Sequence, residues 1–168
     1  MAEFKAVAPE TLKDNPFTLI GGDWMLVTAG DGQKFNTMTA SWGGLGFLWN
    51  RNVAFSFIRP QRYTFEFMEK NDYYTLSFYP KDMKPALGLC GAHSGRDCDK
   101  VKLAGLTPVF DEAAPYFEQA RLVLVCKKLY GQMMTPESFL TDETAAMYKD
   151  GDYHKVYVGE IVKALIKE

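Results

Sequence analysis

The 168-residue sequence has few of the features that mark several classes of protein. It contains only three cysteines, Cys90, Cys98 and Cys126, which are too few for a disulfide framework and favour a reducing cytoplasm. No apolar run reaches the length of a membrane span, and residues 1–16 lack the apolar core of a signal peptide. The formal net charge is only −2, so we expect neither a nucleic acid nor a membrane as partner.

Acidic residues are absent from residues 32–65, although the whole chain has 21 Asp and Glu. The basic residues of that window are Lys34, Arg51, Arg59 and Arg62. Chance clustering of surface arginines would explain this, but the same window holds the hydroxyl-rich stretch "NTMTASW" (36–42). Together they favour a small anionic ligand.

Apolar residues make up 47% of the chain and aromatic residues 14%, which indicates one globular domain over residues 1–168. β-branched and alternating stretches predict strands at 24–29, 36–42, 53–58, 73–79, 121–131 and 154–166. "GDG" at 30–32 predicts a hairpin turn. Many strands with few helices predict a mainly β fold, a barrel or a sandwich, with a few short helices.

The helix signals are short. Residues 62–71 predict a helix with Thr64 as its N-cap, and a second helix is expected from Pro85 to near Gly95. Residues 136–140 predict one more helical turn.

The glycines of "GGLGFLW" do not form a nucleotide-binding motif. The third glycine of a dinucleotide fingerprint is missing, Trp49 stands in its place, and the sequence contains no P-loop. We expect these glycines to let the backbone turn tightly beside a bulky ligand.

The segment "FSFIRPQRYTFEF" predicts an anion site. A strand ends at Ile58, Pro60 forces a turn, and a helix follows whose first N–H groups attract negative charge. Arg59 and Arg62 add fork-shaped donors and Thr64 adds a hydroxyl, all suited to a phosphate. The alternative is a simple Thr64 cap with both arginines solvated.

A second basic segment is "SGRDCDKVK". Its Ser94, Arg96, Lys100 and Lys102 could close over a phosphate from another side, with Asp97 and Asp99 between them. An ordinary surface loop explains the pattern equally well.

The histidines offer weaker candidates. Cys90, His93 and Cys98 resemble zinc ligands, but no fourth ligand is evident, so packing of small residues is favoured and no metal is predicted. His154 precedes a strand, where it is either a strand-edge residue or a proton donor or ligand contact.

Five motifs occur in an order that resembles the flavin reductase-like FMN-binding family, in particular its flavoredoxin-like branch: "NTMTASWGG", "IRPQRYT", "SGRDCDKV", "AGLTPVF" and "HKVYVGEI". The resemblance runs from about residue 16 to 162. It implies a split β-barrel of Greek-key type that forms a homodimer with FMN near the subunit interface.

The resemblance also implies a set of site residues. Along the hydroxyl-rich strand, hydrogen bonds to FMN would come from Asn36, Thr37, Met38, Thr39, Ala40 and Ser41, with Trp42 near the ring. The implied phosphate contacts are Arg59, Arg62, Tyr63 and Thr64, followed by Arg96 and Lys100. His154 corresponds to a histidine that some relatives place near the nicotinamide or flavin, so it is the catalytic candidate.

The implied function is electron transfer through FMN, either as an NAD(P)H-dependent flavin reductase or as a flavoredoxin-type carrier fed by a redox partner protein. The arginine-rich turn resembles relatives that keep FMN bound, and no strong NAD(P)H motif is visible. Two alternatives are a non-redox module for another phosphorylated ligand and a pyridoxamine-phosphate-oxidase-like enzyme, whose substrate motifs are not evident. We therefore expect a cytoplasmic FMN-dependent oxidoreductase.

Overall fold

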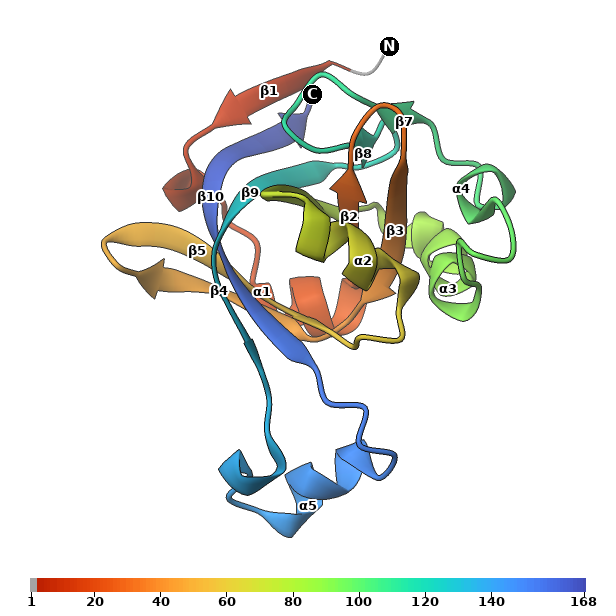
Figure 1. Ribbon diagram of the computed structural model, residues 1–168. Coiled ribbons are helices and arrows are strands. Elements are labelled where there is room, and N and C mark those ends of the chain that lie inside the picture. The colour runs from red at the N-terminus through yellow and green to blue at the C-terminus, as the bar shows by residue number, and fades with distance from the viewer. Residues whose placement is uncertain (1–2) are drawn as a thin grey trace.

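An 8-stranded antiparallel sheet forms the body of the computed structural model, which describes residues 3–168 (Figure 1). Its strands are β1 (Phe4–Val7), β2 (Met25–Gly30), β3 (Phe35–Ala40), β4 (Gly43–Leu48), β5 (Arg51–Ile58), β6 (Tyr73–Phe78), β9 (Leu122–Met133) and β10 (Lys155–Lys167). The short strands β7 (Pro108–Val109) and β8 (Tyr116–Phe117) pair separately. The six predicted strands are all present, whereas β1, β4, β7 and β8 were not predicted.

The sheet curls into a barrel that is split at one place. The strand order is β3-β2-β6-β9-β10-β5-β4, with β1 paired to β10. The two ends of this path, β3 and β4, are consecutive in the chain and joined by Ser41 and Trp42. The expected mainly β split barrel is confirmed, and the split fixes where β3 presents its polar residues.

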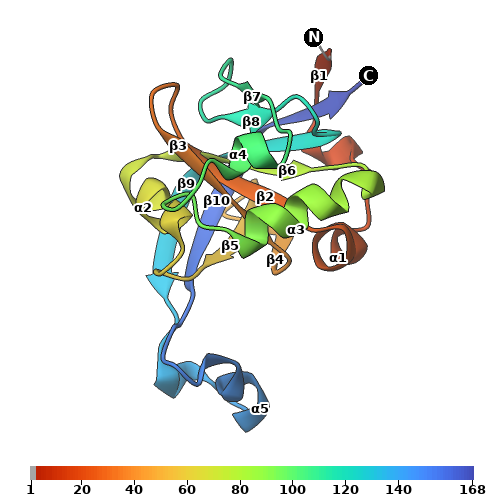
Figure 2. The ribbon, with the colours of Figure 1, turned by 90° about the vertical axis from the view of Figure 1, so that its right-hand side faces the viewer.

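Two apolar clusters hold the sheet together. Met25 and Val27 of β2 point into the barrel, whereas Leu26, between them, belongs to a second cluster outside it. That second cluster includes Leu87 and Cys90 of α3 (Lys84–Ala92), which packs against β3 (Figure 2). Because β2 is covered on both faces, it is buried over its whole length.

Short helices fill the connections. They are α1 (Pro16–Thr18), α2 (Tyr63–Lys70), α3, α4 (Lys100–Leu103) and α5 (Asp142–Ala145), with single turns η1 (Pro9–Thr11), η2 (Leu19–Asp23), η3 (Lys81–Met83), η4 (Pro136–Ser138) and η5 (Ala146–Tyr148). The three predicted helical segments correspond to α2, α3 and η4.

The predicted N-cap of α2 was wrong. The helix begins at Tyr63, so Arg62 is the N-cap and Thr64 lies inside the first turn. Thr64 is fully buried, and its hydroxyl accepts a hydrogen bond from Asn36 Nδ2 at 2.8 Å. A tertiary contact to β3 therefore uses the oxygen that local capping would have used.

The glycine-rich stretch is strand β4, not the tight turn that we expected. A Cβ on Gly43 would lie 2.8 Å from the Phe55 carbonyl oxygen, so glycine lets β4 pair closely with β5. The tight turn comes afterwards, at Trp49 and Asn50, whose φ angles are +52° and +56°. Two such residues between paired strands give a hairpin turn that follows the twist of the sheet.

A long arm leaves the barrel. β9 and β10 continue past the body as a two-stranded ribbon, and residues 134–153 at its end, here called the arm, carry η4, α5 and η5 (Figures 1 and 2). Within the arm, the ring of Tyr148 lies 5.3 Å from those of Phe139 and Tyr153. This aromatic cluster gives the arm a small core of its own.

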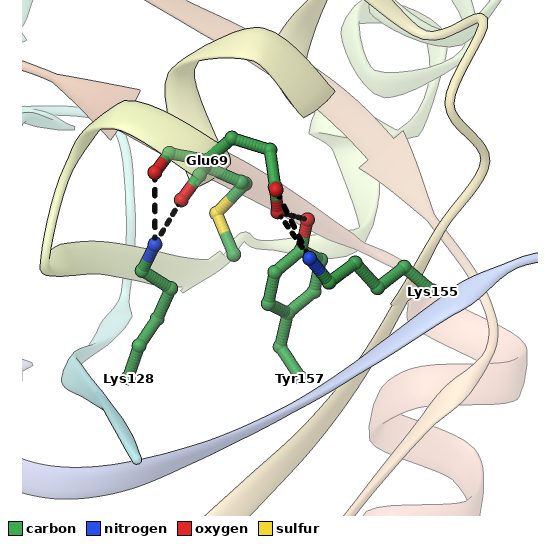
Figure 3. Close-up of polar contacts among 5 residues, drawn as sticks. Glu69, Lys128, Lys155 and Tyr157 are labelled. Carbon is green, nitrogen blue, oxygen red and sulfur yellow. Dashed lines mark hydrogen bonds and ion pairs between the residues drawn. The ribbon is translucent and has the colours of Figure 1, made fainter. Parts of the chain in front are cut away.

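A polar network fastens the end of α2 to the base of the ribbon (Figure 3). Glu69 accepts hydrogen bonds from Lys155 Nζ at 2.8 and 3.0 Å and from the Tyr157 hydroxyl at 2.6 Å. Lys128 Nζ donates to the carbonyl oxygen of Met68 in the last turn of α2. Burial opposes ionisation of Glu69, but the hydrogen bonds outweigh it and lower its pKa.

We expect Glu69→Gln to lower the free energy of unfolding at pH 7 by about 1 kcal/mol, because one charged acceptor serves two donors. The native pKa lies below that of the unfolded chain, so this stabilisation is present above pH 4.5 and fades as pH falls through the native pKa. Denaturant unfolding at pH 7 and pH 3 measures both effects. Glu66→Gln, which removes a more exposed pair with Arg96, is the control and should cost less. Equal losses at both pH values would contradict the argument.

Candidate functional site

Two cavities adjoin at the split of the barrel. The first, of about 250 Å³, lies against residues 38–42 and is called the aromatic cavity. The second, of about 230 Å³, lies against the start of α2 and is called the cationic cavity. Met38 and Arg62 line both cavities, so together they form one elongated site along β3.

The cationic cavity is built around two positive side chains. Lys100 is only 4% exposed, and its ammonium donates to the carbonyl oxygens of Cys90 at 2.9 Å and His93 at 3.0 Å. Arg62 donates to the Gly91 carbonyl oxygen at 3.2 Å. Both side chains keep further N–H donors, because an ammonium has three and a guanidinium five.

No ion pair neutralises these two cations among residues 3–168. Burial lowers the pKa of Arg62, with Arg59 lowering it further. Burial likewise lowers the pKa of Lys100, and Arg62 adds to that effect. Asp97 lines the same cavity, but it is exposed. Two partly desolvated cations that face one space favour an anion there.

The start of α2 completes the cationic cavity. Tyr63 and Thr64 line it, and within residues 3–168 their N–H groups donate to no main-chain oxygen, whereas the N–H of Phe65 donates to Arg62. Asn36 reaches this point from β3 through its bond to Thr64. Gly95 allows the approach, since a Cβ there would lie 2.0 Å from Asn36 Oδ1.

The aromatic cavity has flat apolar walls and one histidine. Trp42 lies 5.3 Å from the ring of His154, and Phe57 lies 6.4 Å from it. His154 Nδ1 lies 2.6 Å from the Tyr148 hydroxyl. Burial lowers the pKa of His154 to about 4, and Arg59 contributes. At neutral pH His154 is therefore an uncharged hydrogen-bonding group and not an imidazolium acid.

Most of the predicted site residues meet here. Those that line the aromatic cavity are Met38, Thr39, Ala40, Ser41, Trp42, Arg59, Arg62 and His154. Those that line the cationic cavity are Asn36, Met38, Arg62, Tyr63, Thr64 and Lys100. The hydroxyl of Thr39 already donates to the Leu87 carbonyl oxygen at 2.5 Å, which ties β3 to α3.

Two predicted residues lie elsewhere. Thr37 is fully buried and bonds to the Thr28 hydroxyl at 2.8 Å, because alternate residues of a strand face opposite sides. Arg96 pairs with Glu66 at 2.5 Å, and its guanidinium carbon lies 4.7 Å from the centre of the Tyr63 ring. Neither side chain lines the two cavities.

Several residues at or beside the site were not predicted, among them Phe57, Gln61, Tyr148 and Asp152. Phe57 was read only as part of a buried strand, and Gln61 only as part of the turn. Tyr148 and Asp152 belong to the arm, whose return to the turn before α2 is a tertiary event. Their type and spacing carry no local motif.

A third cavity, of about 530 Å³, adjoins the aromatic cavity through Ser41, Trp42 and Phe57. Its other walls include Phe17, Leu45 and Tyr148, and no charged side chain lines it. An uncharged flat group would fit this space better than a charged one.

Within residues 3–168 no group of three or more His, Cys, Asp and Glu side chains could hold a metal ion. Over the same range, none of the helices is both long and apolar enough to cross a membrane.

The chain belongs to the flavin reductase-like domain family, whose family model, "Flavin reductase like domain", matches residues 19–168. That match covers the whole barrel from the end of α1 onward, and with it both cavities. A search of curated proteins gave no match.

Solved structures share the fold. An FMN-binding domain of a flavin reductases-like enzyme from Shewanella baltica is 16% identical, with a TM-score of 0.70 over 98% of this chain and 78% of that one. Flavoredoxin from Desulfovibrio vulgaris is 20% identical, with a TM-score of 0.67 over 98% and 76%. An NADH:FAD oxidoreductase from Streptomyces globisporus is 16% identical, with a TM-score of 0.64 over 87% and 77%.

We expect inorganic phosphate to raise the melting temperature of the cofactor-free protein, because it would neutralise Arg62 and Lys100. Arg62→Gln and Lys100→Gln should each weaken the apparent phosphate affinity about tenfold, since a hydrogen bond to a charged group contributes about 1.5–3 kcal/mol. The phosphate-dependent shift in each variant, not the absolute melting temperature, is the measurement. Lys102→Gln, an exposed lysine of α4, is the control. Unchanged phosphate-dependent shifts in both site variants would show that the anion does not bind at Arg62 and Lys100.

Proposed function

We propose that this chain is an FMN-binding flavoprotein that transfers electrons. The observation that carries the proposal is the pair of partly desolvated cations, Arg62 and Lys100, at the start of α2. A phosphate monoester carries a charge of about −1.5 to −2 at pH 7, which balances two cations. A phosphodiester or diphosphate link carries less charge per phosphate, so the terminal phosphate of FMN fits best.

The rest of the site suits the rest of FMN. Met38 lies between the two cavities, where the ribityl chain would run along β3. Trp42 and Phe57 offer flat apolar walls to the ring and exclude water from it. The uncharged His154 offers a hydrogen bond whose direction depends on the Tyr148 hydroxyl. When bound, the flavin supplies the redox chemistry, and these residues bind and orient it.

The uncharged third cavity is where a second redox participant would reach the ring, in this proposal. The nicotinamide ring of NAD(P)H or a small flat acceptor would suit its lining. Support for both roles comes from the solved relatives, which include an NADH:FAD oxidoreductase and a flavoredoxin. The site is therefore compatible with both a reductase and an electron carrier.

Anaerobic titration of the FMN-loaded protein separates these roles. Bleaching of the visible spectrum by NADH or NADPH identifies a reductase, whereas bleaching only by a reduced protein identifies a carrier. Binding of other phosphorylated ligands without flavin would favour a non-redox module. Oxidation of pyridoxamine phosphate would favour the oxidase-like alternative.

We expect the cofactor to be FMN and not FAD. The adenylate of FAD would have to extend into a cavity of about 650 Å³ that adjoins the cationic cavity, and the carboxylates of Asp97 and Asp99 in its lining would repel the second phosphate. Chromatography of the cofactor released from the purified protein decides between them, and mainly FAD would refute the expectation.

Arg62→Ala should weaken FMN binding about tenfold or more, with a smaller effect of salt than in the wild type.

We also propose a homodimer. Large apolar side chains are exposed on the β4–β5 hairpin and on the arm: Phe47 is 69% exposed, Trp49 54%, and Leu140 95%. Such a surface is unusual for a monomer of this size. Light scattering across a wide concentration range should give twice the chain mass of 19.0 kDa. A constant monomer mass would rule the dimer out, and Phe47→Ser with Trp49→Ser should favour the monomer.

A further inference from the structure

Arg59 and Arg62 lie three residues apart on one turn, and both line the aromatic cavity. Their surroundings differ. Within residues 3–168, Arg62 has a carbonyl oxygen as partner and no carboxylate, whereas Arg59 forms an ion pair with Asp152 of the arm. The guanidinium carbon of Arg59 also lies 5.2 Å from the centre of the Tyr148 ring. Arg59 therefore has its charge matched within the protein.

Asp152 is held from two sides. The same oxygen, Oδ2, that pairs with Arg59 also accepts a hydrogen bond from Gln61 Nε2 at 3.1 Å. The side chains of Arg59 and Asp152 are only 27% and 18% exposed, so solvent screens this pair less than a surface pair. Arg59 and Gln61, both in the turn before α2, therefore donate hydrogen bonds to the same carboxylate of the arm.

This junction lies next to the wall of the aromatic cavity. His154, which lines the aromatic cavity, comes two residues after Asp152, and the Tyr148 ring lies against the guanidinium of Arg59. The Tyr148 hydroxyl and His154 Nδ1 form a hydrogen bond of 2.6 Å. The position of both groups relative to the cavity therefore depends on how the arm returns to the turn.

We propose that Asp152 is a positioning residue that holds Arg59 at the aromatic cavity and neutralises its charge there. The inference rests on the proposed function, because it places the flavin ring in that cavity. The two arginines of the turn then have different roles. Arg62, together with Lys100, binds the phosphate, whereas Arg59 binds Asp152 and so connects the arm to the site. The ring then lies beside a neutral pair and not beside a free cation.

The consequence is a lower reduction potential for the bound flavin. Reduction increases the negative charge on the ring, so a free cation in this partly dry site would stabilise the reduced form. Asp152 cancels that effect of Arg59. Removing the carboxylate charge while keeping its shape should shift the midpoint potential to a more positive value.

Asp152→Asn tests this in the FMN-loaded protein. We expect a more positive midpoint potential and FMN binding at least as tight as in the wild type. Asp152→Asn combined with Arg59→Gln should return the potential toward the wild-type value, because it removes the freed cation. Glu137→Gln is the matched control, since it makes the same charge change at an exposed site of the same arm and should leave the potential unchanged.

A measurement without cofactor keeps this inference separate from the proposed function. In the cofactor-free protein, the NMR signal of the Arg59 Nη1–H group that donates to Asp152, assigned by its loss in Arg59→Lys, should be present in the wild type and Glu137→Gln. It should weaken by exchange with water in Asp152→Asn. Failure of the wild type to bind FMN would refute the proposed function, while an unchanged Arg59 signal in Asp152→Asn would refute the positioning role. A midpoint potential equal to that of Glu137→Gln would refute the electrostatic role.

Discussion

Two cations, Arg62 and Lys100, share one small space and have no carboxylate partner among the described residues. Burial disfavours the charged form of both, the charge of Arg59 adds to this effect at Arg62, and the charge of Arg62 adds to it at Lys100. An anion relieves both effects at once. The fold keeps the two cations in place through main-chain oxygens of α3 and of the loop after it, so their arrangement does not depend on a flexible surface.

Several structural features serve that arrangement. The barrel is split between β3 and β4, so β3 can present Asn36 and Met38 to the cavities and still bury Thr37 against β2. α2 begins where β5 ends, and Glu69 ties the far end of α2 to β10. Helix, strand and loop therefore meet at one point, each held by contacts outside the site itself.

The arm also contacts the site. It contacts the turn before α2 through Asp152, which forms an ion pair with Arg59, and His154, two residues later, lies with its ring 5.3 Å from that of Trp42. The site thus has a positive end, where Arg62 and Lys100 lie, and a nearly neutral aromatic end. A ligand with one charged end and one flat apolar end matches this division. The family to which the chain belongs is consistent with such a ligand.

The sequence by itself determined the elements with clear local signals. β-branched, apolar and alternating stretches predicted six of the strands, proline and glycine bounded α3, and the strand–turn–helix order around Arg62 indicated an anion site. Short or glycine-rich strands such as β1 and β4 were missed because they are stabilised by pairing with other strands and not by local preference.

Only the tertiary structure decided which cations stay free. Arg59 and Arg62 look alike along the chain, and Arg96 and Lys100 look alike as well. Asp152 lies 93 residues from Arg59, and Glu66 lies 30 residues from Arg96, so no local pattern could show that these two arginines are already paired.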